Sequence, residues 1–129
     1  MNSYRKFDDS IQREIIEAKE KKETIFSLIN YGLTEIPKNI FAIESLRYLD
    51  LRWNCLKTIS PEISRLTNLR ILYLSSNQLE NLPDDFTQLS NLDELYLDRN
   101  NLLFIPSVIF QLKKLNCLVL SFNQVDEIS

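Results

Sequence analysis

The amino-acid sequence predicts an α/β solenoid, in which short parallel strands stack into a curved arc behind an N-terminal helix. Two observations support this fold class. From Leu46 onward, leucines recur in fixed columns at intervals of 23 residues. An amphipathic stretch at residues 8–22 precedes the repeat. Because stacked turns share one continuous core, we expect a single domain over residues 1–129 with an N-terminal capping helix within residues 1–22.

The repeat divides the rest of the chain into turns of equal length. Four turns cover residues 23–45, 46–68, 69–91 and 92–114, and residues 115–129 are a partial last repeat. The turns from residue 46 onward begin with L-x-x-L-x-L-x-x-N-x-L, with Val125 in place of the final leucine in the last turn. In the first turn, Glu23 replaces the opening leucine and Tyr31 replaces the asparagine, as is typical of a terminal repeat. Since L-x-L alternates with a period of two, each turn predicts a short strand with its leucines on one face.

Two further columns indicate how each turn leaves its strand and closes. Asparagine recurs at Asn54, Asn77, Asn100 and Asn123, where its amide can satisfy backbone groups that a turn leaves unpaired. Proline recurs at Pro37, Pro83 and Pro106, and its missing N–H limits strand pairing on the side of the turn that descends from the sheet. We expect the strand leucines to pack against convex-side pairs, which are Ile63 and Leu66, Phe86 and Leu89, and Ile109 and Leu112.

The 23-residue spacing and its head motif resemble those of leucine-rich repeats, over nearly the whole chain. A helix followed by a divergent first repeat is also similar to the start of stand-alone bacterial leucine-rich repeat proteins and of the repeat arms of Roco-type signalling proteins. The resemblance implies a parallel sheet on the concave face and short 3-10 or irregular segments on the convex face. It also implies that protein partners bind the concave face.

Residues 8–22 form one apolar stripe when drawn as a helix, because Phe7, Ile11, Ile15 and Ala18 recur every three or four positions. Residues 8–10, with the sequence Asp-Asp-Ser, would cap its start. We expect this helix to cover the open first turn; the alternative is a segment that binds a partner.

Composition excludes several classes of enzyme. The chain has no histidine, which excludes a Ser-His or Cys-His nucleophile, and a single glycine, which excludes a glycine-rich phosphate loop. Cys55 and Cys117 lie three turns apart, or about 14 Å at the spacing of strands, so we expect two free thiols. We expect no cofactor and no metal site.

The same composition bears on partners and location. The net charge is −3, and basic residues do not gather in one column, so we expect no nucleic-acid partner. No apolar run approaches the roughly 18 residues of a membrane span, and the first residues show no secretory signal. We therefore expect a cytoplasmic protein with no membrane association.

Mapping the concave positions of the resembled family onto the chain gives the candidate partner-binding residues. They are Tyr48, Asp50, Arg52, Trp53, Ile71, Tyr73, Glu94, Tyr96, Asp98, Arg99 and Phe122. Tyr73 and Tyr96 are explained well by stacking across neighbouring strands, whereas an exposed Trp53 favours a binding role. The three acids are interpreted as rim charges that pair with Arg52 and Arg99 or that steer a basic partner.

The function that these observations favour is a non-enzymatic protein–protein interaction module. One alternative is that the repeats are the recognition arm of a larger signalling or effector protein whose chemistry lies elsewhere. A second alternative is a hydrolase or transferase using the concave acids Asp50, Glu94 and Asp98, although an open sheet offers little burial to shift a carboxyl pKa.

Apolar residues concentrate toward the end of the chain. They are Leu103, Phe104, Val108, Phe110, Leu118, Val119, Leu120, Val125 and Ile128. Two readings follow: either the chain is a fragment of a longer repeat array, or this end packs on a second copy. We expect the second, an end-to-end homodimer through residues 103–129.

Overall fold

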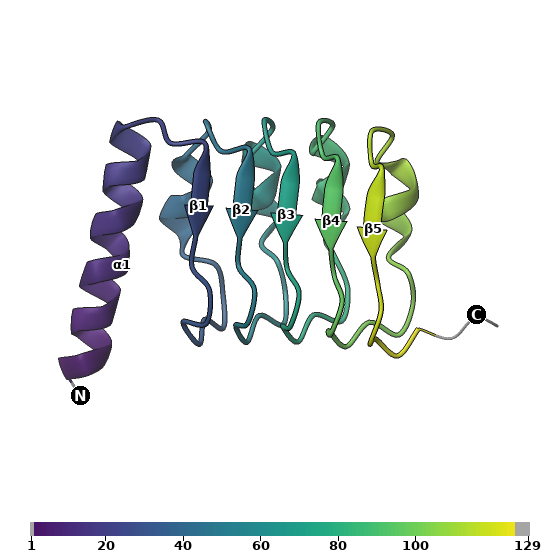
Figure 1. Ribbon diagram of the computed structural model, residues 1–129, viewed down its shortest axis with the longest axis horizontal. Coiled ribbons are helices and arrows are strands. Elements are labelled where there is room, and N and C mark those ends of the chain that lie inside the picture. Colours follow the sequence, from purple (N-terminus) through teal and green to yellow (C-terminus); the bar gives the residue numbers. More distant parts are fainter. Residues whose placement is uncertain (1, 126–129) are drawn as a thin grey trace.

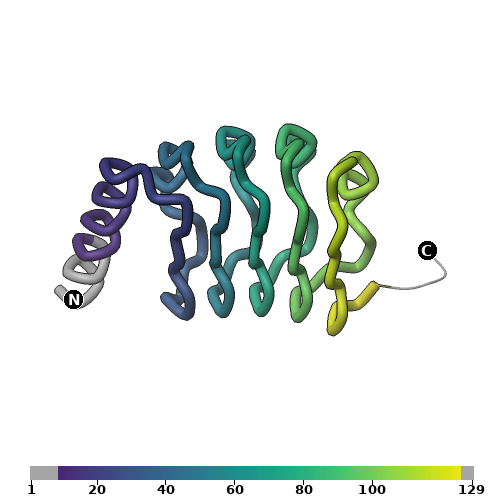
Figure 2. The backbone as a smooth tube through the Cα atoms, turned by 45° about the horizontal axis from the view of Figure 1, so that its top comes forward, coloured from purple at the N-terminus to yellow at the C-terminus, as the bar shows by residue number. Residues whose placement is uncertain are grey.

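A computed structural model describes residues 2–125, with side chains for residues 9–125. Over this range the chain forms one α-helix and a stack of turns (Figure 1). Each of the first four turns has a strand on one side and a 3-10 helix behind it, and the described part of the last turn has a strand alone. The strands lie side by side in chain order, with the helix beside the first of them (Figures 1 and 2). The elements are α1 (Asn2–Glu20), β1 (Ile25–Ser27), η1 (Lys38–Ala42), β2 (Tyr48–Asp50), η2 (Pro61–Arg65), β3 (Ile71–Tyr73), η3 (Asp84–Gln88), β4 (Glu94–Tyr96), η4 (Ser107–Gln111) and β5 (Cys117–Val119).

Helix α1 differs from its prediction at both ends. It begins at Asn2, so residues 8–10 lie inside the helix and do not cap its start. The helix ends at Glu20. Beyond it, Lys22 adopts a left-handed backbone conformation with φ 52°, and the N–H of Glu23 donates to the carbonyl of Ala18 at 2.9 Å. This arrangement is a Schellman motif, which usually places glycine where Lys22 stands.

The apolar stripe of α1 packs as the helical spacing predicted. Ile11, Ile15 and Ala18 are each at most 5% exposed and belong to the same core as the strands, whereas the side chain of Phe7 lies outside the described residues. The amide of Asn39 also donates to the side chain of Gln12, which joins η1 to the helix. Helix α1 therefore closes the apolar end of the first turn.

The sheet is parallel, and each strand pairs with the next strand of the sequence. The register aligns the central residues Phe26, Leu49, Leu72, Leu95 and Leu118. Leu49, Leu72 and Leu95 are fully buried, because the turns on both sides cover them. The predicted solenoid with a parallel sheet is confirmed.

Short 3-10 helices form the side of the core opposite the sheet. The residue before each is Pro37, Ser60, Pro83 or Pro106, so the proline column marks where these helices begin. Proline suits this position because its fixed φ leads into the helix and its missing N–H leaves no donor unpaired. In η2, Ser60 replaces proline, and its hydroxyl accepts a hydrogen bond from the N–H of Glu62 at 3.1 Å. The predicted convex-side pairs are all at most 7% exposed.

The asparagine column forms a ladder through the core. The side-chain oxygen of Asn77 accepts from the N–H of Leu56 at 3.0 Å, and its NH₂ donates to the carbonyls of Leu51 at 3.0 Å and Leu74 at 3.1 Å. Asn100 repeats these bonds one turn later. Each amide therefore joins two successive turns at the point where the chain leaves the strand, as the sequence predicted.

Candidate interaction surface

The residues that flank the buried centre of each strand form one surface, here called the strand face. They are Ile25 and Ser27, Tyr48 and Asp50, Ile71 and Tyr73, Glu94 and Tyr96, and Cys117 and Val119. The register places Tyr48 beside Ile71, and places Tyr73 between Asp50 and Tyr96. Tyr48 and Tyr73 thus occupy different columns.

Tyr73 and Tyr96 stack across β3 and β4, with ring centroids 4.8 Å apart and planes inclined by 12°. The hydroxyl of Tyr96 donates to Glu94 Oε1 at 2.6 Å, and this hydrogen bond is the main reason that the pKa of Tyr96 is raised above its ordinary value. The Sγ atom of Cys117 lies 3.9 Å from the same hydroxyl oxygen. These tyrosines therefore stabilise the sheet, in agreement with the explanation of stacking across strands.

A two-pronged ion pair lies beside this stack. Arg52 Nε donates to Asp50 Oδ1 at 2.9 Å and Arg52 Nη2 to Asp50 Oδ2 at 2.6 Å, which confirms the predicted pairing of Asp50 with Arg52. The hydrogen bond to Asp50 raises the pKa of the Arg52 guanidinium. The guanidinium carbon also lies 4.9 Å from the ring centroid of Tyr73, so charge and aromatic stack form one fixed cluster.

Asp98 and Arg99 do not pair in the way that the sequence suggested. The hydroxyl of Ser75 donates to Asp98 Oδ1 at 2.6 Å, and within the described residues Arg99 forms no ion pair. The guanidinium carbon of Arg99 instead lies 4.3 Å from the ring centroid of Phe122. Sequence reasoning missed Ser75, although it stands one turn before Asp98 in the same column.

A second line of side chains, here called the turn row, follows the strands. Its members all adopt left-handed backbone conformations, with φ between 58° and 61°; they are Asn30, Trp53, Ser76, Arg99 and Phe122. Trp53, Arg99 and Phe122 therefore lie in the turns beyond the strand ends, and not on the strands themselves. Trp53 is 60% exposed and Phe122 is 71% exposed, so the structure leaves both rings open to solvent.

Two exposed apolar residues at the first strand were also missed as candidates. Ile25 is 62% exposed and Ile29 is 39% exposed. The signal that could have found them is the alternation in residues 25–29, IFSLI, whose other apolar members Phe26 and Leu28 are buried. The apolar part of the surface therefore extends to β1.

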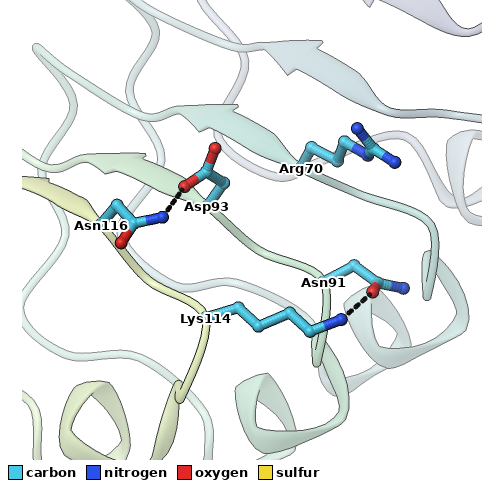
Figure 3. Close-up of a pocket in the computed structure, with 5 residues that line it drawn as sticks. All are labelled: Arg70, Asn91, Asp93, Lys114 and Asn116. Atoms are coloured by element: carbon cyan, nitrogen blue, oxygen red, sulfur yellow. Dashed lines mark hydrogen bonds between the residues drawn. The ribbon is translucent and has the colours of Figure 1, made fainter.

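A polar pocket of about 340 Å³ opens beside the N-terminal ends of strands β3, β4 and β5 (Figure 3). Asn116 donates to Asp93 Oδ1 at 2.6 Å, and Lys114 donates to Asn91 Oδ1 at 3.2 Å. Arg70 completes the lining, and its guanidinium points to the same side as the Lys114 amine (Figure 3). Asp93 is the single carboxylate in this lining, so the pocket holds no pair of acids for proton transfer.

The remaining chemistry of the described residues is sparse. Among residues 9–125, no three side chains of the cysteine, aspartate and glutamate types come close enough to hold a metal ion. The three acids predicted on the concave face each hold a separate partner, respectively a guanidinium, a phenol and a serine hydroxyl. Cys55 and Cys117 are both free, as expected. No helix within residues 2–125 is apolar over a length that could cross a membrane.

The apolar residues predicted for self-association divide into three groups. Leu103, Phe104 and Phe110 are exposed, at 53%, 63% and 75%. Val108 is only 2% exposed and belongs to the core, which corrects its assignment to a surface. The partly buried members are Leu118, Val119, Leu120 and Val125, and Ile128 lies outside the described residues.

Comparison with known protein families settles the relationship. A family model described as a leucine-rich repeat region matches residues 34–128. The chain belongs to the leucine-rich repeat family. A search of curated protein sequences gave no significant match.

Solved leucine-rich repeat structures superpose on the chain. A leucine-rich repeat protein of Leptospira interrogans matches with a TM-score of 0.66 and 30% sequence identity over 84% of this chain. The crystal structure of the leucine-rich repeat domain of APL1B matches with a TM-score of 0.73 and 27% identity over 88% of this chain. In each case the match covers 34% of the solved chain, so this leucine-rich repeat chain spans about a third of the length of either.

Proposed function

We propose that this leucine-rich repeat chain is a non-enzymatic module that binds a protein partner through the strand face and the adjoining turn row. The family supports a role in protein interaction in general terms. The specific support is the exposure of large side chains along this surface, chiefly Ile25, Tyr48 and Trp53. Exposed aromatic residues beside arginine form the composition that is enriched in the energetic centres of protein interfaces.

A photo-crosslinking amino acid placed on the strand face tests this function. Benzoylphenylalanine would replace Tyr48, and in a control protein it would replace Gln88, which is exposed at the end of η3. In extracts of the source organism we expect a discrete cross-linked product from position 48 that is absent from position 88. Identical products from both positions, or none from position 48, would overturn the proposal.

We also propose that the chain acts in the cytoplasm, as the recognition part of a protein whose other activities lie elsewhere. Free thiols at Cys55 and Cys117 suit a reducing compartment. The solved chains extend well beyond the part that this chain matches, which is compatible with an arm of a larger assembly.

A second candidate is self-association through the last turns. Phe104 and Phe110 leave more than half of their surface in solvent, and Leu118 is only partly buried where Leu95 is fully buried. We propose a homodimer through this end. Light scattering across a dilution series should show a dimer that Phe104→Ser with Phe110→Ser converts to a monomer. A monomeric mass at every concentration would refute it.

A further inference from the structure

The turn row holds five side chains in a line across the stack. Backbone hydrogen bonds continue the sheet ladder into these turns, since the N–H of Trp53 donates to the carbonyl of Ser75 at 3.1 Å and that of Arg99 donates to Ser121 at 2.9 Å. Neighbouring members are therefore one strand spacing apart, or about 4.8 Å. The backbone hydrogen bonds therefore fix the spacing of the side chains along the row.

The Trp53 side chain does not contribute to the core of the fold. Left-handed φ values favour glycine and asparagine, and Asn30 occupies the same place one turn earlier. The Trp53 ring is 60% exposed, and among residues 9–125 its indole makes no hydrogen bond and no ring contact. Such a side chain is available to insert into an apolar site of a partner.

Phe122 provides a second exposed ring three turns from Trp53. At one strand spacing for each turn, the two positions are about 14 Å apart. Arg99 lies between them, two turns from Trp53 and one turn from Phe122, with its guanidinium against the Phe122 ring. Within the described residues its charge is not neutralised by an ion pair. The row therefore presents two apolar anchors with a free positive charge between them.

We infer that the turn row binds an extended peptide segment whose two apolar side chains are four residues apart, with an acidic side chain at the position midway between them. Four residues of extended chain span about 13 Å, and residues separated by two or four positions face the same side. A helix advances only about 6 Å over four residues, so a helical segment with this spacing does not match. The inference deepens the proposed function and rests on it.

A synthetic peptide of nine residues tests the spacing, with its ends acetylated and amidated: Ser-Thr-Leu-Ser-Glu-Ser-Leu-Thr-Ser. Trp53 is the only tryptophan of the chain, so its fluorescence reports directly on the row. Binding should shift the emission to shorter wavelength and protect the ring from acrylamide quenching, in a saturable way, because the peptide removes the indole from water.

Two control peptides test the placement of the side chains and the charge: the first also moves both leucines to the side opposite glutamate, and the second changes the charge alone. Ser-Thr-Ser-Leu-Glu-Leu-Ser-Thr-Ser has the same composition with its leucines only two residues apart, and a second control replaces glutamate by lysine. Each should bind at least about tenfold more weakly, as expected when one contact of an interface centre is lost. Equal affinity for the first two peptides would overturn the inference.

Protein variants test the other end of the row while keeping the reporter. Phe122→Asn retains a residue that accepts the left-handed φ, and Phe122→Asn and Arg99→Ala should each weaken binding about tenfold or more. Ile16→Gln removes an exposed apolar side chain on α1, outside both proposed surfaces, and should leave binding unchanged. No effect of Phe122→Asn, or no binding of the peptide at all, refutes the inference. Cross-linking from position 48 in that case would still support the strand face as a binding surface.

Discussion

At the scale of single residues, the asparagine ladder is the main set of buried polar side chains in the fold. Each of Asn54, Asn77 and Asn100 is at most 7% exposed. No buried side-chain nitrogen or oxygen in the described residues lacks a hydrogen-bond partner. A buried amide of this kind stabilises the fold because it satisfies backbone groups that would otherwise lose their hydrogen bonds to water.

Replacement of Asn77 by alanine should destabilise the protein strongly. The substitution removes the partner of the Leu56 N–H, whereas the carbonyls of Leu51 and Leu74 lose one donor each and keep the amides of Asn54 and Asn100. One unsatisfied buried group costs about 1–3 kcal/mol, so we expect a loss of about 2 kcal/mol or more in the free energy of unfolding. Urea denaturation followed by circular dichroism measures it.

The matched control for Asn77 is Asn68, whose amide donates to the carbonyl of Glu44 at 2.9 Å on an exposed edge. Asn68→Ala should cost less than about 1 kcal/mol, because water can replace that partner. Equal losses from the two substitutions would contradict the importance of burial for the ladder.

The sequence predicted the hydrogen bonds of a residue correctly where its position in the repeat alone determines its partners. The asparagine bonds follow from repeat spacing, since every turn places its amide against the same backbone groups. Side-chain pairs on the strand face did not follow, because Asp98 has two candidate partners, Ser75 one turn earlier in its column and Arg99 next in the sequence, and repeat spacing does not choose between them. The left-handed φ of Trp53 was also hidden, because its residue type argues against that conformation.

At the scale of elements, helix α1 shows what periodicity can and cannot establish. The spacing of Ile11, Ile15 and Ala18 identified the buried stripe, because packing on the first turn requires one apolar face. The start of the helix was predicted six residues late, because the Asp-Asp-Ser stretch at residues 8–10 carries a capping signal that the longer helix overrides. Local capping preferences are weak compared with the continuation of a helix.

Replacement of a buried residue of α1 by alanine should show that this helix stabilises the repeats. Ile15 is 1% exposed, and Ile15→Ala should lower the free energy of unfolding by about 2–4 kcal/mol through lost contacts and a cavity. Ile16 is the natural control, since it is 51% exposed on the same helix, and Ile16→Ala should cost less than about 1 kcal/mol. Thermal unfolding of both variants compares them; similar midpoints would mean that α1 does not pack firmly on the first turn.

At the scale of the whole molecule, stability should be distributed along the stack because each turn contacts only its neighbours. Strand β3 pairs with β2 and β4, whereas within the described residues β5 pairs with β4 alone. The burial agrees with this gradient, since Leu72 on β3 is fully buried and Leu118 on β5 is partly exposed. Helix α1 gives the first turn a cover that the described part of the last turn does not have.

Hydrogen exchange measured by nuclear magnetic resonance can resolve this gradient amide by amide. The N–H of Leu51 donates to Tyr73 on β3 at 2.9 Å, and the N–H of Leu97 donates to Val119 on β5 at 2.8 Å. The bonds are nearly identical in length, so a difference in exchange reports the opening of whole turns and not the strength of one bond. Opening the last turn breaks one interface between turns, whereas exposing Leu51 requires a larger opening, and we expect Leu97 to exchange at least about tenfold faster. Equal rates at the two amides would mean that the stack opens as one cooperative unit despite its linear contacts.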